Sequence, residues 1–473
     1  MNNIGTDLCY FSVSEILSGY RKKSISPVDV IKSVFEKIKE CNEYVNAFVC
    51  FNQELALAAA VSSEKRWMKA EPMGLIDGVP VTLKDLIPVK DWNIRRGSIT
   101  TDIENLSRID SPVAARLREN NAIFIGSTTT PEFGWKAVTD SPLMGITRNP
   151  WDLSKTPGGS SGGAAVSASL GMGAVHIGSD GGGSLRIPAS FTGVFGFKGT
   201  AGRVPVYPES ILGSMYHIGS ITRSVQDTAL LLNIISKPDH RDWSALPFDN
   251  FDYSHETKLI LSNLRIGFSP RLGYANVDPE VASLVKDGVA VLEGIGARIE
   301  EIDPGFSSPI NCFTILWRSA LSHSLKSLSD KQKDVLDPEL RDLVNGSSSI
   351  TLSEYQDAMN DRIELKKIMN GFYNQYDLLI TPTLPITAFK VGRLVADNEF
   401  QKNWPDWSPF SYPFNLSGEP ACSIPCGFTS AGLPVGMQIV APRYKDHLLI
   451  EVAKLFEEQR PFRFPVIGKV SEM

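Results

Sequence analysis

Residues 156–203 contain a run of glycine and serine that constrains the fold of this chain more than any other segment. Two serine-bearing turns lie within it: residues 158–163 read GGSSGG, and residues 180–184 read DGGGS. Because glycine lacks a Cβ atom, such turns bend tightly and allow close approach of the backbone. Between them, an Ala/Ser-rich run of helical character leads into a short strand over 174–178. The pattern therefore predicts two tight turns that flank a helix and a strand.

The rest of the chain alternates helical and strand patterns, which is typical of an α/β protein. We expect helices over 12–40, 53–66, 111–120, 279–293, 351–374 and 446–460, and strands over 79–83, 122–126, 297–303, 377–380, 421–425 and 434–440. Ser26-Pro27 resembles a helix cap followed by proline at the first helical position. The polar, aromatic segment 237–262 is expected to be a surface connection.

Length and charge exclude several classes of protein. The 473 residues are 42% apolar, enough for a sizeable core, and no Pro/Ser/Gly-rich linker divides them. The net charge of −6, with both signs interspersed, argues against a nucleic-acid-binding surface. The six cysteines form no CxxC pair and no zinc-ligand spacing, so we expect reduced thiols and no metal site.

The sequence shows no feature of export or membrane insertion. The N-terminus lacks a basic segment followed by a long apolar run, so we expect no secretory signal. No stretch approaches the length of about 18 consecutive apolar residues that a membrane-spanning helix needs. We therefore expect a cytoplasmic protein with no membrane partner.

Ser184 has the local context of a nucleophile, because a strand delivers the chain to three glycines and the serine follows them. The N–H groups of such a turn can point into one cavity and hold a developing oxyanion. Residues 184–189 then favour the start of a helix, whose positive end adds to this effect.

A serine nucleophile needs a base. None of the six histidines has a context that singles it out. Lys84 follows the apolar strand and precedes Asp85, and burial among hydroxyl groups can leave a lysine unprotonated. The residues alone leave open whether Lys84 is this base or an ordinary surface lysine.

Three separated motifs together resemble the amidase signature family. They are DGVP at 77–80 with Lys84-Asp85, GGSSGG at 158–163, and SDGGGSLRIPASFTGVFGFKGTAGR at 179–203. Ser160 and Ser184 are 24 residues apart, as the pattern of the family requires, and residues 414–442 resemble its closing segment. The resemblance spans nearly the whole chain, and this combination of motifs in this order is highly specific.

The resemblance implies a role for each matching residue. Lys84 would be the general base, Ser160 a bridging serine held by a cis peptide, and Ser184 the acylated nucleophile. The oxyanion hole would be formed by the N–H groups of Gly181, Gly182, Gly183 and Ser184, and support would come from Asp180, Arg186 and Ser161. No cofactor and no metal is implied. In one departure, Gly181 stands where the family usually has threonine (TDTGGS). The change leaves every N–H in place, and two effects stay open: a looser oxyanion loop or more room for substrate.

The resemblance also implies the architecture. We expect a single large α/β domain over 1–473, with a mixed, twisted central β-sheet covered by helices on both faces. Its parts would be an N-terminal helical segment of about 1–70, a catalytic core with the signature region at about 77–203, and a C-terminal segment of about 375–465 that completes the core.

The expected activity is hydrolysis of a small-molecule amide by a monomer or homodimer. Apolar and aromatic residues near the motifs favour an apolar or aryl amide, with esters or carbamates as further substrates. The candidate substrate-binding residues are Gly159, Phe133, Trp135, Tyr207, Met215, Tyr216, Trp317 and Leu384.

Two alternatives remain. The same family includes the glutamine-hydrolysing amidase subunit of the aminoacyl-tRNA amidotransferase, which works with partner subunits. The other alternative is an α/β-hydrolase-type esterase, because residues 158–162 fit the GxSxG nucleophile elbow, with Ser160 as nucleophile and His447 as a candidate base. Against the elbow, the residues before Ser160 have the pattern of a loop, whereas an elbow follows a strand directly.

Overall fold

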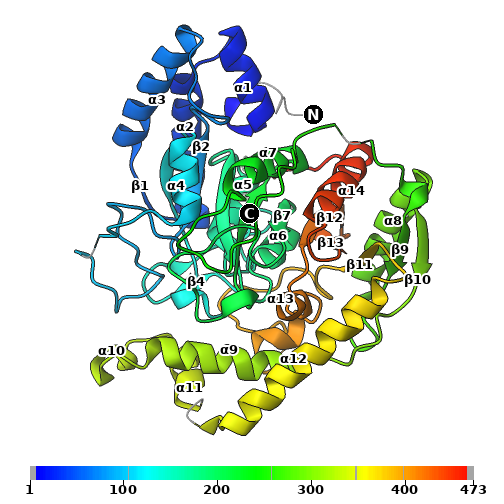
Figure 1. The fold of residues 1–473 in the computed structure, drawn as a ribbon. Helices are drawn as coiled ribbons and strands as arrows, with labels where there is room; N and C mark the ends of the chain where they lie inside the picture. The colour runs from blue at the N-terminus through cyan, green and yellow to red at the C-terminus, as the bar shows by residue number, and fades with distance from the viewer. Residues whose placement is uncertain (1–6, 105, 257, 347–348, 398, 466–473) are drawn as a thin grey trace.

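The computed structural model describes residues 7–465 except 105, 257, 347–348 and 398. One sheet of 11 strands runs through the molecule from β1 at one edge to β10 at the other (Figure 1). Across the sheet, the strands are β1 (Phe48–Phe51), β3 (Ile123–Thr128), β2 (Pro80–Lys84), β6 (Val175–Asp180), β8 (His217–Thr222), β7 (Phe195–Lys198), β12 (Ala421–Phe428), β13 (Pro434–Val440), β11 (Leu378–Pro382), β9 (Arg265–Phe268) and β10 (Arg298–Glu301).

The sheet is mixed. Strands β3, β2 and β6 are parallel, and so are β11, β9 and β10, whereas antiparallel strands join the two groups. Parallel neighbours need a crossover connection, and the chain supplies helices for it. Helix α4 (Pro112–Glu119) lies between β2 and β3 in the chain, and α8 (Pro279–Gly294) lies between β9 and β10. The expected mixed sheet of an α/β domain is confirmed.

Helices cover both faces of the sheet, as two neighbouring residues of β13 show. Successive strand residues point to opposite faces. On one face, α6 (Arg186–Thr192) packs against Gly436. A Cβ atom at residue 436 would lie 2.7 Å from the hydroxyl of Ser190, so glycine leaves the room that the helix needs. On the other face, Met437 contacts α8 at Gly288, where a Cβ atom would lie 3.3 Å from the sulfur.

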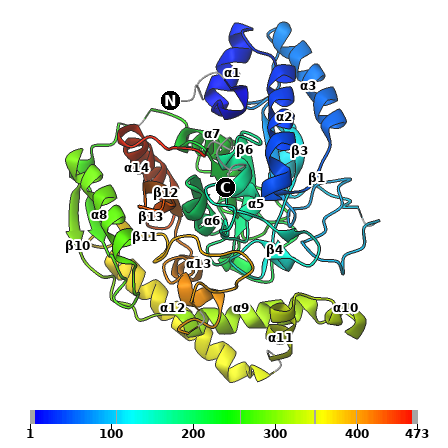
Figure 2. The ribbon, with the colours of Figure 1, turned by 180° about the vertical axis from the view of Figure 1, so that it is seen from behind.

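The remaining helices form the two ends of the molecule. Helices α1 (Val13–Lys22), α2 (Pro27–Val45) and α3 (Gln53–Met68) lie at one end, and α9 (Ile310–Leu325), α10 (Asp330–Asp334), α11 (Pro338–Gly346) and α12 (Leu352–Phe372) lie at the opposite end (Figures 1 and 2). Helices α5 (Gly162–Ser169), α7 (Val225–Ile235), α13 (Pro413–Ser417) and α14 (Asp446–Gln459) pack between these ends. The cap predicted at Ser26-Pro27 is present, with Pro27 opening α2.

Most of the elements that the sequence pattern predicts are present, with shifted ends. The strand expected over 174–178 extends to Asp180 in β6, and the helix expected from 184 begins at Arg186. The pattern made no prediction for 310–346, which form α9, α10 and α11, and it missed β1, β7, β8 and β9. The boundaries of the three expected parts of the chain stay predictions, and residues 1–6 and 466–473 lie outside the described residues. No helix in the described part of the chain has the length and apolar character of a membrane span.

The packing of α14 provides a test of the core. The side chain of Phe456 is fully buried. Truncation to alanine leaves a cavity, so Phe456→Ala is expected to lower the free energy of unfolding by about 3–5 kcal/mol. Phe400, which is 78% exposed, is the matched control, and Phe400→Ala is expected to change this energy by less than about 0.5 kcal/mol. Urea denaturation measures both, and equal effects of the two variants would contradict this description of the core.

Candidate active site

Lys84 ends β2 inside the protein, and its amine contacts three serine hydroxyls. Its side chain is fully buried. The Nζ atom donates to Ser160 Oγ at 2.6 Å, to Ser161 Oγ at 3.0 Å and to Ser179 Oγ at 3.1 Å. No ion pair of the described residues includes Lys84. The lysine therefore lies among neutral oxygen atoms instead of beside a carboxylate.

This environment favours the neutral amine. Burial lowers the pKa of Lys84 to about 7, and the charge of Asp180 opposes this shift only in part. Desolvation disfavours the charged form of an amine, and the hydroxyl groups supply hydrogen bonds without supplying negative charge. At neutral pH a substantial share of Lys84 is therefore deprotonated and able to accept a proton.

The two glycine turns place their serines side by side. The peptide bond between Gly159 and Ser160 is cis, and α5 begins directly after the turn at Gly162. The main-chain N–H of Ser161 donates to the main-chain oxygen of Ser184 at 3.2 Å, which joins the first turn to the second. Ser160 and Ser184 are both buried.

Asp180 and Arg186 form a fully buried ion pair that braces the second turn. The guanidinium of Arg186 donates to both carboxylate oxygens of Asp180, at 2.9 and 3.0 Å, and also to the side chains of Asn415 and Gln438. The Asp180 carboxylate also accepts from the N–H groups of Gly183 and Leu185, at 2.7 and 3.2 Å. Although burial opposes it, the charge of Arg186 holds the pKa of Asp180 well below its usual range.

The hydrogen bond from Gly183 to Asp180 corrects one expectation. The sequence predicted that the N–H groups of Gly181, Gly182, Gly183 and Ser184 would all bind an oxyanion. The N–H of Gly183 is engaged with a carboxylate and is not available to a substrate oxygen. Among the described residues, no hydrogen bond uses the N–H of Gly181, Gly182 or Ser184. The turn therefore offers three N–H groups.

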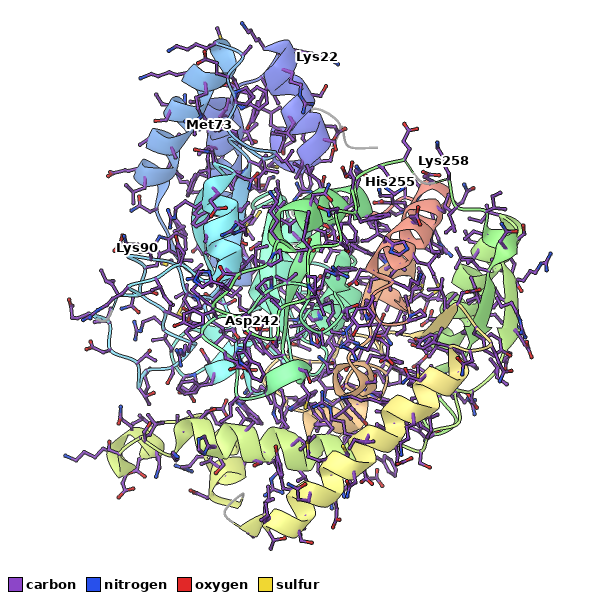
Figure 3. The ribbon with its side chains drawn as sticks, in the orientation of Figure 1. Lys22, Met73, Lys90, Asp242, His255 and Lys258 are labelled. Carbon is purple, nitrogen blue, oxygen red and sulfur yellow. The ribbon has the colours of Figure 1, made fainter. Side chains whose placement is uncertain are left out.

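No metal or histidine chemistry is indicated at this site. The described residues contain no cluster of His, Cys, Asp or Glu that could hold a metal ion, and no hydrogen bond joins one of their histidines to Ser160 or Ser184. His176 pairs with Thr82 and His217 with main-chain oxygens, whereas His255 lies at the surface beside Glu451 of α14 (Figure 3). Within the described residues, no strand directly precedes Ser160, so the nucleophile elbow expected of an α/β-hydrolase is not formed.

Known proteins share this combination of fold and motifs. A family model described as Amidase matches residues 29–450. The chain belongs to the amidase signature family. It is 32% identical to an acylamidase of Rhodococcus erythropolis, over 96% of this chain and 97% of that protein. It is also 32% identical to the A subunit of the glutamyl-tRNA(Gln) amidotransferase of Listeria welshimeri, over 96% and 98% of the two chains. The structure of a bacterial aryl acylamidase superposes with a TM-score of 0.89 at 28% identity and covers 96% of each chain.

The amidase carries an aromatic cluster against its second glycine turn. Phe313 and Trp317 of α9 and Trp404 contact one another, with ring centroids 5.4–5.5 Å apart. A Cβ atom at Gly182 would lie 2.7 Å from both Phe313 and Trp404. These rings, together with Trp135, border a cavity of about 270 Å³. A larger groove of about 1130 Å³ lies near the ends of β9 and β10, and none of the predicted site residues lines it.

The structure brings several of the predicted substrate-binding residues to this site. The loop of Phe133 and Trp135 passes Ser160, because a Cβ atom at Gly134 would lie 3.5 Å from its Oγ. Trp317 lies against the turn. Burial raises the pKa of Tyr216, and the side chain of Ser179 opposes this rise. Gly159 is part of the first turn, where a Cβ atom would lie 2.8 Å from the carbonyl carbon of Val138. The amidase therefore has no room for a side chain at residue 159.

The other predicted residues lie differently. The ring of Tyr207 lies under the guanidinium of Arg241, at 5.3 Å, which gives it a partner in another loop. Met215 and Leu384 are buried in the core, and the main-chain oxygen of Met215 accepts from Asn415. We find no contact of Tyr207 or Leu384 with the glycine turns among the described residues. The expectation that these two residues line the site stays a prediction.

Sequence reasoning missed the aromatic residues that come from distant segments. Phe313 lies in α9, for which no helix was predicted, and Trp404 lies in the short helix Trp404–Trp407. Both are more than 100 residues from the glycine turns in the chain. Their aromatic character is the only signal in the sequence, and aromatic residues are equally common in cores.

The buried ion pair allows a test of the scaffold. Asp180→Asn leaves the guanidinium of Arg186 buried without a counter-ion, so the free energy of unfolding is expected to fall by about 3–5 kcal/mol. Asp330, whose exposed carboxylate lies 3.9 Å from Lys333, is the matched control. Asp330→Asn should change this energy by less than about 0.5 kcal/mol. Denaturant unfolding measures both variants, and a stable Asp180→Asn protein would show that the pair does not brace the turn.

Proposed function

We propose that this amidase hydrolyses apolar or aryl amides through an acyl-enzyme on Ser184, with Ser160 and neutral Lys84 as the proton relay. The observation that supports this most directly is the fully buried amine of Lys84, 2.6 Å from Ser160 Oγ and without a carboxylate partner. A serine becomes a nucleophile when a base can accept its proton. The bridging serine allows Lys84 to act on Ser184 from the next turn.

In the first half of the reaction, Lys84 accepts the proton of Ser160 while Ser160 accepts that of Ser184. The Oγ atom of Ser184 forms a bond to the amide carbon, and the carbonyl oxygen becomes an oxyanion. The N–H groups of Gly181, Gly182 and Ser184 stabilise this charge, an effect of about 3–4 kcal/mol for each well-placed donor. As the C–N bond breaks, the proton returns through Ser160 to the leaving amine.

The second half repeats these steps with water. Water loses a proton through Ser160 to Lys84, attacks the acyl carbon, and releases the acid as Ser184 regains its proton. The two serines and the lysine need no metal or organic cofactor for any of these transfers. The small-molecule amide is the proposed partner, and the proposed site binds no nucleic acid.

The preference for apolar or aryl amides is supported by the rings of Phe313, Trp317 and Trp404 beside the turn. Similarity to an acylamidase and to the aryl acylamidase structure supports the same class of substrate. Similarity to the A subunit of the glutamyl-tRNA(Gln) amidotransferase favours a second candidate, glutamine hydrolysis within a complex. Glutaminase activity together with partner proteins that co-purify would favour the second candidate.

Substitution of the relay tests the mechanism. We expect Ser184→Ala to lower kcat/KM for an aryl amide such as acetanilide by roughly ten-thousandfold or more. Loss of the proton relay in Ser160→Ala or Lys84→Met should lower it by about a hundred- to ten-thousandfold. The exposed Ser62 and Lys367 provide matched controls, and Ser62→Ala and Lys367→Met should keep wild-type rates. If Ser184→Ala is active and Ser160→Ala is inactive, the nucleophile is Ser160.

The pH dependence tests the base. Because the reactive form of Lys84 is the neutral amine, kcat/KM is expected to rise as the pH increases through about 7, the pKa to which burial lowers this group. A rate profile from about pH 5 to about pH 9 measures it. A rate that falls over this range would contradict the assignment, because it would require a protonated group in the free enzyme.

A further inference from the structure

Residue 181 is where Trp317 of α9 approaches the second glycine turn. A Cβ atom at Gly181 would lie 3.0 Å from Cζ3 of Trp317 and 3.1 Å from Cδ1 of Leu212. Carbon atoms in ordinary contact are about 3.5–4.0 Å apart, so a side chain here would displace the indole. Gly181 does not have a positive φ, and its backbone would therefore accept alanine or threonine without strain. The size of the side chain at residue 181 is therefore limited by the position of Trp317 and not by the backbone.

The position of Trp317 is fixed by its neighbours. Its Nε1 donates to the main-chain oxygen of Trp135 at 3.2 Å, and its ring stacks on Phe313 at 5.4 Å and meets Trp404 edge-on at 5.5 Å. The residue is 6% exposed and borders the 270 Å³ cavity. The flat indole ring of Trp317 is therefore fixed against the residues that offer N–H groups to the substrate oxygen.

A second tryptophan of the same cavity is also held inside the protein. Trp135 also lines the cavity and is 1% exposed, yet its Nε1 has no hydrogen-bond partner among the described residues. A buried donor without a partner is costly in a folded protein.

We propose that Gly181 and Trp317 act as a pair that determines substrate specificity: the absence of a side chain at residue 181 lets the indole of Trp317 lie against the turn, where it selects a flat aryl group on the amide. This inference rests on the proposed function, since it concerns the substrate held at Ser184. Aromatic pairs gain energy from offset stacking or edge-to-face contact beyond the area that they bury. A saturated ring of similar size cannot make these contacts equally well.

The test compares acetanilide with N-cyclohexylacetamide, which differ in the flatness of the ring. Because their leaving amines differ in basicity, only the change in the ratio of the two kcat/KM values between variants is informative. We expect Trp317→Leu and Gly181→Thr each to lower the preference for acetanilide by about five- to tenfold, and Gly181→Ala to lower it less. Gly294→Ala is the control, because nothing lies within 4 Å of a Cβ atom there.

The double variant tests the coupling between the two residues. If Gly181→Thr acts by displacing the indole, adding it to Trp317→Leu should have little further effect on the ratio. Effects that multiply in the double variant, or ratios that equal those of the wild type, would overturn the proposal. Thermal unfolding of each variant shows whether a loss of activity reflects a loss of the fold, and the ratio of two substrates on one protein is insensitive to the fraction folded.

Binding to Ser184→Ala separates this proposal from the catalytic one. Isothermal titration calorimetry measures the Kd of both amides in the Ser184→Ala protein, with and without Trp317→Leu. If the wild type hydrolyses neither amide but Trp317→Leu weakens binding of acetanilide selectively, the specificity pair stands and the proposed catalysis fails. If the amides are hydrolysed and Trp317→Leu changes neither the kcat/KM ratio nor the Kd ratio, the specificity pair is wrong and the proposed function stands.

Discussion

The burial of an amine without a counter-ion is the constraint on which the rest of this site depends. Lys84 ends a central strand, and its parallel neighbour β6 carries Ser179 to the same place. Hydroxyl groups from three serines satisfy the hydrogen bonds of Nζ, whereas a carboxylate in their place would stabilise the ammonium ion and raise the pKa. The amine of Lys84 is thus kept neutral by burial among hydroxyl groups, which the fold places around it.

This arrangement links stability to pH. The pKa of Lys84 in the folded protein is lowered to about 7 from the ordinary value of 10.5. Between these two values the unfolded chain binds more protons than the folded protein, so the contribution of this group to stability rises with pH across that window. Below the lower value, the folded protein has to hold a buried ammonium ion. The burial that favours the neutral amine of Lys84 therefore lowers the stability of the fold in acid.

The ion pair of Asp180 and Arg186 makes the neutral lysine compatible with a nearby carboxylate. Asp180 is charged because Arg186 holds its pKa well below the usual range, and this charge alone would favour protonation of Lys84. Arg186 donates to both oxygens of this carboxylate and places a positive charge beside it. The two side chains thus hold the second glycine turn, and the positive charge of Arg186 offsets part of the effect of the carboxylate on Lys84.

The sequence predicted the elements that carry strong local signals. The cap at Ser26-Pro27, the apolar strand before Lys84 and the paired strands around Gly432 are all present. It missed α9 and the strands β7 and β8, whose packing partners are distant in the chain. A local sequence pattern does not specify which face of an element packs against which neighbour. Contacts between distant segments, such as that of Trp317 with Gly181, could therefore not be predicted from it.

The sequence by itself determined the family, the reaction class and the residues around which the site is built, because glycine turns and the serines in them are local features with characteristic spacing. The tertiary structure decided what surrounds them. It showed that the N–H of Gly183 is bound to Asp180, that the amine of Lys84 donates to the hydroxyl groups of three serines, and that the aromatic cluster comes from α9 and Trp404. These properties depend on desolvation and on contacts between distant segments, which exist only after the chain has folded.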